Sequence, residues 1–137
     1  MSSEIQAFAI GFPEALIHAG CSFALLVAAC ALYVGLSPYK EIQQIREGNA
    51  AAAISFGGVI VGLAAPLAVS MNASTSALEV VVWGVAVVFL QLLTFRIIDV
   101  LLSGLPQRAQ DGDVAAASLL VAAKLSAALI LSAAVAG

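Results

Sequence analysis

Charged side chains are scarce in this sequence. Lys and Arg number 5 and Asp and Glu number 8 among 137 residues, so only 9% of the chain is charged, against about a quarter of an average soluble domain. The net charge of −3 is small and scattered. A nucleic-acid partner is therefore not expected, because binding to the phosphate backbone needs a concentration of basic residues.

Histidine and cysteine are almost missing, which excludes several kinds of site. The chain has one His and two Cys, and no metal-ligand spacing is present. Cys21 and Cys30 are nine positions apart, about 180° round one predicted helix, so they cannot form a disulfide with each other. No nucleophile lies beside a base in the pattern of a catalytic site. We therefore predict no metal, no cofactor and no enzymatic activity.

The first twelve residues contain neither Lys nor Arg. A cleavable signal peptide begins with a basic region. We therefore expect the first apolar helix to be retained in the mature protein.

Apolar residues dominate the remainder and predict an integral membrane protein. They make up 63% of the chain, and the mean hydropathy is +1.11. A run of about 20 apolar residues spans a hydrocarbon core of ~30 Å. Such runs lie near 14–36, 50–71, 78–102 and 114–136. The predicted fold is all-α, with four transmembrane helices in a single membrane domain, 1–137.

One short motif occurs twice, at an offset of 64 residues. Each copy has an acid, a glycine and a helix-capping residue before an alanine-rich run: Glu47, Gly48 and Asn49, then Asp111, Gly112 and Asp113. Gly can take the positive φ that ends one element, and Asn or Asp accepts the first free N–H groups of the next helix. Two tandem two-helix repeats are therefore predicted, at about 14–71 and 78–136.

Basic residues predict the orientation in the membrane. Those near span ends are Lys40, Arg46, Arg96 and Arg108, around the first and third connections, whereas the termini and the loop 72–77 have none. Cytoplasmic loops carry the excess of Lys and Arg. Both termini are therefore expected on the periplasmic side of a bacterial inner membrane.

The connections between the spans differ in sequence. Ser37-Pro38 is typical of a helix start and predicts a short amphipathic helix on the cytoplasmic interface, ended by Gly48. The second connection, 104–112, is shorter and contains Pro106. The two copies are therefore expected to differ there.

Small residues recur at a spacing of four in two of the spans. Their positions are Gly58 and Gly62 in the second span and Ser118, Ala122 and Ser126 in the fourth. Small side chains let helix backbones approach closely in lipid. We expect both faces to pack inside the four-helix unit.

Lys124 is the most unusual residue of the chain. It is about ten residues into the fourth span, ~15 Å deep, where a charge costs ~2.5 to 3.5 kcal/mol. It should therefore be buried against protein, at a subunit interface or beside a polar pathway. Gln91, at a similar depth in the third span, is its expected partner, with acids from another chain as the alternative.

Two further polar groups complete the candidate intramembrane sites. Glu14 and His18 share one face of the first span and are either hydrated near the outer interface or part of a proton relay. Arg96 and Asp99 are three positions apart and are expected to pair with each other, either as a snorkelling pair or as a substrate gate.

The repeated motif and the four spans resemble the YjfL-like family of small bacterial inner-membrane proteins, known as domain of unknown function 350. The resemblance covers nearly the whole chain. It implies a four-helix inner-membrane protein of two tandem units, and it supplies no activity, catalytic residue or cofactor.

Two classes of function remain open from the sequence. The first is a non-enzymatic structural or accessory subunit of a membrane assembly, in the bilayer with itself or a larger membrane protein complex as its partner. The alternative is a small oligomeric channel or carrier with a polar pathway near Lys124. An even number of spans in each repeat would make the two copies parallel.

Overall fold

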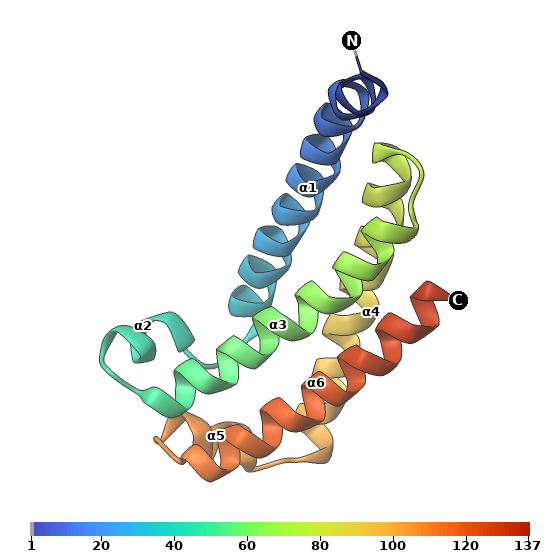
Figure 1. The fold of residues 1–137 in the computed structure, drawn as a ribbon. Helices are drawn as coiled ribbons and strands as arrows, with labels where there is room; N and C mark the ends of the chain where they lie inside the picture. Colours follow the sequence, from blue (N-terminus) through green and yellow to red (C-terminus); the bar gives the residue numbers. More distant parts are fainter. Residues whose placement is uncertain (1) are drawn as a thin grey trace.

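The computed structural model describes residues 2–137 as a bundle of helices (Figure 1). Its elements are α1 (Ser3–Leu36), α2 (Glu41–Arg46), α3 (Ala50–Ala73), α4 (Ala77–Leu101), α5 (Leu105–Gln110) and α6 (Val114–Ala136). Four of these, α1, α3, α4 and α6, are long and apolar enough to cross a membrane. The predicted all-α fold with four candidate spans is confirmed.

Both copies of the acid-glycine-cap motif have the expected turn geometry. Gly48 and Gly112 have φ of 91° and 95°, a region that L side chains rarely adopt. Asn49 Oδ1 then accepts a hydrogen bond from the Ala52 N–H, 3.1 Å, at the start of α3. Asp113 Oδ1 accepts the equivalent bond from the Ala116 N–H, 3.2 Å, at the start of α6.

The predictions for the two connections were wrong in detail. The Ser37 side chain does not cap a short helix, since Ser37 terminates α1 and α2 begins only at Glu41. The second connection is not divergent in form, because it contains α5, a helix of the same length as α2. Pro106 lies in the first turn of α5, where its missing N–H would have had no partner in the helix anyway.

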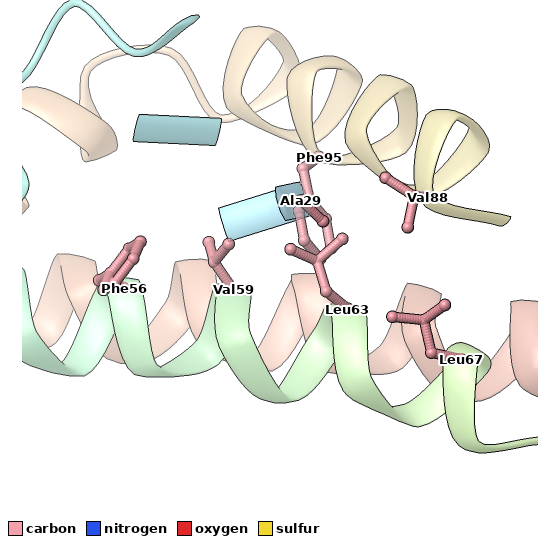
Figure 2. Packing of buried hydrophobic residues seen from close by; sticks show 7 residues of the cluster. All are labelled: Ala29, Phe56, Val59, Leu63, Leu67, Val88 and Phe95. Carbon is pink, nitrogen blue, oxygen red and sulfur yellow. The ribbon is translucent and has the colours of Figure 1, made fainter. Parts of the chain in front are cut away.

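Helix α3 lies at the centre of the bundle and contacts every other helix. It runs beside α6 in the same direction, with α4 behind both (Figure 1). Figure 2 shows its apolar face meeting α4 and α1 in one buried cluster. The cluster consists of Ala29, Phe56, Val59, Leu63, Leu67, Val88 and Phe95.

The small residues of α3 pack closely, but those of α6 do not. A Cβ added to Gly58 would be 2.7 Å from a methyl of Val121 on α6, and one added to Gly62 would be 2.7 Å from the Phe95 ring on α4. Such distances are closer than side chains normally approach, so these glycines permit the contacts.

The expected packing face of α6 was wrong. Ser118, Ala122 and Ser126 are exposed, and the hydroxyls of Ser118 and Ser126 bond to carbonyls of their own helix. The inward face of α6 instead carries Ala117, Leu120, Lys124 and Ala128. Spacing alone could not decide, because almost every face of α6 is rich in small residues.

Helix α1 extends well beyond the bundle. It has 34 residues, about 51 Å at 1.5 Å each, whereas a bilayer core is ~30 Å thick. The Ser2 hydroxyl caps its start, and Ala29 is its only buried residue within the described chain. The helix starts eleven residues before the predicted span and contains Pro13 in its interior.

Candidate functional site

A lysine and an aspartate meet inside the bundle. Lys124 of α6 is 1% exposed, and its Nζ lies 2.9 Å from Asp99 Oδ1 on α4. The Tyr33 hydroxyl of α1 is 3.5 Å from the same Nζ, and the Tyr33 and Phe95 rings are each centred 5.5 Å from it. Lys124 is thus buried against protein, as expected, with partners from its own chain.

Two expected pairings of these residues were wrong. Lys124 pairs with Asp99 instead of Gln91, and Asp99 therefore does not pair with Arg96 within residues 2–137. Lys124 and Gln91 start at similar depths, but a lysine stem carries its ammonium several ångström along the helix. The stem here extends towards the connections, where Asp99 lies near the end of α4.

Gln91 has a different role, because it donates a hydrogen bond to a backbone carbonyl of α3. Pro66 lies inside α3 and has no N–H to give to the carbonyl four residues earlier, that of Gly62. Gln91 is fully buried, and its Nε2 donates to this Gly62 oxygen at 2.7 Å. A neighbouring helix thus satisfies a carbonyl that would otherwise be unpaired in an apolar interior.

Lys124 and Asp99 line a cavity of about 580 Å³. It lies at the end of the bundle where the two connections meet. Ligand pockets typically measure 300 to 1,000 Å³, so its size suits a small molecule. The lining residues are Tyr33, Leu36, Ser37, Pro38, Tyr39, Glu41, Ser55, Leu92, Arg96, Asp99, Val100, Ser103, Gly104, Pro106, Gln110 and Lys124.

Glu41 is the most unexpected member of this lining. It is the first residue of α2 and only 2% exposed. Its Oε1 accepts a hydrogen bond from the Ser37 hydroxyl, while Oε2 is buried with no hydrogen-bond partner. An unmet buried acceptor of this kind costs ~1 to 3 kcal/mol, and more when it is charged.

Gln110 brings a second unmet acceptor from the other connection. It is the last residue of α5 and is buried, and its side-chain Oε1 has no hydrogen-bond partner. Its backbone carbonyl accepts from Asn49 Nδ2 at 2.7 Å. The cap residue of α3 therefore ties the two connections together at the mouth of the bundle.

Tyr33, Glu41 and Gln110 were not predicted as site residues. Glu41 falls in the predicted amphipathic helix, where a charged side chain is normally solvated. Its burial depends on how α1, α2 and α5 fold over one another, which a one-helix pattern does not contain. Arg96, by contrast, was predicted as a candidate and lines the cavity with an exposed side chain.

Glu14 and His18 lie apart from this cavity. His18 Nε2 is 3.8 Å from Glu14 Oε1, and the Glu14 side chain is 59% exposed. Neither residue is part of the cavity lining. This polar face of α1 is therefore a separate feature, on a helix segment that projects from the bundle.

Comparison with known proteins identifies the family. The profile described as "Domain of Unknown Function (DUF350)" matches residues 7–135. The inner membrane protein YjfL of Escherichia coli K12, described as UPF0719, is 25% identical over 103 residues, 75% of this chain and 78% of its own. Its counterpart in Escherichia coli O157:H7 matches equally. No solved structure matches. The expected YjfL-like resemblance is confirmed: the chain belongs to the DUF350 family.

Proposed function

We propose that this protein is a channel or carrier subunit of a bacterial inner membrane, with the cavity around Lys124 as its solute site. The observation that carries the proposal is the buried Lys124–Asp99 pair beside a cavity of about 580 Å³. Ionisable residues inside membrane segments commonly mark pathways for ions or substrates. A buried ion pair alone adds little stability, so stability does not account for its presence.

In the proposed architecture, the protein consists of two tandem two-helix units, α1 with α3 and α4 with α6. Three observations support it: the motif recurs at an offset of 64 residues, α2 and α5 begin 64 residues apart, and α3 and α6 start at the same offset. The two units would be parallel, as in transporters built from repeats about an axis normal to the membrane.

In the proposed membrane orientation, both termini lie in the periplasm and the cavity lies at the cytoplasmic side. Lys40, Arg46 and Arg108 flank the end of the bundle that contains the cavity, and cytoplasmic loops are enriched in such residues. A periplasmic reporter fused after Gly137 should be active, and a cytoplasmic reporter should be silent. The opposite pattern would reverse the orientation.

A non-enzymatic structural or accessory subunit is the second candidate. The first half of α1 carries exposed apolar residues and contacts little of its own chain. A neighbouring copy or a larger membrane protein would cover such a helix as readily as lipid. Co-purification of a stoichiometric membrane partner from native membranes would favour this function.

Solute permeation in reconstituted vesicles tests the channel or carrier function. The vesicles are shrunk osmotically with a panel of small polar solutes, and light scattering follows their recovery. We expect faster recovery than in protein-free vesicles for at least one solute, and a loss of that effect in Ser55→Leu, which fills the cavity. Ser126→Leu is the matched control, because Ser126 lies on the exposed face of α6. Wild-type vesicles that recover no faster than protein-free ones for every solute would refute the function.

A further inference from the structure

The cavity offers hydrogen-bond acceptors that lack donors. Two buried side-chain oxygens in its lining have no hydrogen-bond partner within residues 2–137, namely Glu41 Oε2 and Gln110 Oε1. Asp99 Oδ1 is not among them, because the Lys124 ammonium lies 2.9 Å away. No buried donor of the lining is left over in the same way. A ligand that completes this site therefore has to donate.

The charged groups of the lining balance formally, Glu41 and Asp99 against Arg96 and Lys124, but only Lys124 and Asp99 are in contact as an ion pair. Lys124 and Asp99 neutralise each other. Glu41, at 2% exposure, has no cationic group within ion-pair distance in the described chain. A buried carboxylate without a counter-charge is strongly disfavoured, whereas Arg96, the other charge of the lining, is exposed and can be solvated. A cation bound beside Glu41 would therefore stabilise its buried carboxylate.

The rest of the lining indicates an organic cation. Leu36, Pro38, Leu92 and Val100 supply apolar walls, and Tyr33 contributes an aromatic ring. A volume of about 580 Å³ is far larger than a bare metal ion requires. Apolar walls with a few polar groups are typical of sites for small organic molecules, and aromatic rings attract ammonium groups.

We propose that this cavity binds a small organic ammonium compound, with the N–H groups of its charged end donating to Glu41 and Gln110. The inference rests on the proposed channel or carrier function, because it names the class of solute. Glu41 supplies the counter-charge from α2, and Gln110 supplies a neutral acceptor from α5.

Equilibrium binding to the full-length protein in detergent tests the proposal, with ethylammonium chloride as the probe and calorimetry as the readout. We expect saturable binding of ethylammonium. Tetramethylammonium, which carries the charge but no N–H donor, and potassium should bind much more weakly at the same ionic strength. Glu41→Gln should weaken ethylammonium binding roughly 10- to 100-fold, the loss expected for a charge-assisted hydrogen bond.

Glu47→Gln is the matched control. Glu47 ends the same connection, is exposed and accepts only from the Gln43 side chain, so its variant should bind like the wild type. If Glu41→Gln does not fold, the three-cation series on the wild type still decides. Absence of saturable ethylammonium binding, or equal binding of potassium, would overturn the proposal. Binding unchanged in a folded Glu41→Gln protein would do the same.

This experiment is independent of the vesicle test. If the protein binds ethylammonium but allows no solute to permeate, the proposed ligand class stands and the proposed transport function is refuted. If the protein conducts a solute without binding ethylammonium, the proposed transport function stands and the proposed ligand class is refuted.

Discussion

Replacing Asp99 by Asn should destabilise the protein strongly, because it leaves the Lys124 ammonium buried without its counter-charge. Removing one partner of a buried ion pair typically costs ~3 to 5 kcal/mol. The Tyr33 hydroxyl at 3.5 Å and two aromatic rings at 5.5 Å from Nζ remain and compensate in part, so we expect about 3 kcal/mol. For a chain of this length, that loss corresponds to a fall in Tm of about 10 °C.

A second substitution, at Lys124 on α6, distinguishes the effect of the unpaired charge from the effect of losing Asp99 itself. Lys124→Met removes the buried charge, so the double variant Asp99→Asn/Lys124→Met should recover most of the lost Tm, because apolar replacement of buried pairs is often neutral or stabilising. Thermal unfolding of the purified proteins in one detergent, followed by circular dichroism, gives all four values. Glu47→Gln serves as the exposed control. The reasoning fails if the Tm of Asp99→Asn equals that of the wild type, or if the Tm of the double variant is no higher than that of Asp99→Asn.

Two further predictions concern packing and pH. Gly58→Ala should lower the Tm, because overpacking against Val121 costs about 1 to 3 kcal/mol. Gly57→Ala meets open space and should leave the Tm unchanged or raise it slightly, since Ala favours a helix more than Gly does. Equal melting of the two variants would contradict the close packing at Gly58. The hydrogen bond from the Ala116 N–H, aided by Arg108, lowers the pKa of Asp113, so its contribution to stability is present above its unfolded-state pKa and lost as the pH falls through the lower folded-state value. The Tm difference between wild type and Asp113→Asn should therefore shrink on acidification below about pH 4, and a difference independent of pH would contradict it.

Most of the helical architecture was predictable from local patterns. Apolar length located the four long helices, and the glycine and cap residues located the starts of α3 and α6 to the residue. These features depend on a few neighbouring positions and on the thickness of a bilayer. The short helix α5 was not predicted, because the shorter second connection with Pro106 indicated that the two copies differ there, although proline is compatible with a first turn.

The candidate site was predictable only in part. The energetic cost of a charge at mid-depth was enough to predict that Lys124 is buried. Its partner was not predictable from depth, because the lysine stem displaces the ammonium along the helix and brings it to Asp99. Glu41 and Gln110 become neighbours of one cavity only through the folding of two connections over the bundle end. Such a juxtaposition is a property of the tertiary structure and leaves no local signature.

The contact between Gln91 and the Gly62 carbonyl makes two positions on different helices depend on each other. Gln91 has a backbone acceptor to satisfy only because Pro66 leaves that carbonyl free. A residue with a backbone N–H at position 66 would donate to the Gly62 carbonyl within α3. The Gln91 amide would then be buried in an apolar setting without this acceptor. Among homologous sequences, a proline here and an amide donor at position 91 are therefore expected to appear and disappear together, so that this pair should emerge as a covarying contact between α3 and α4.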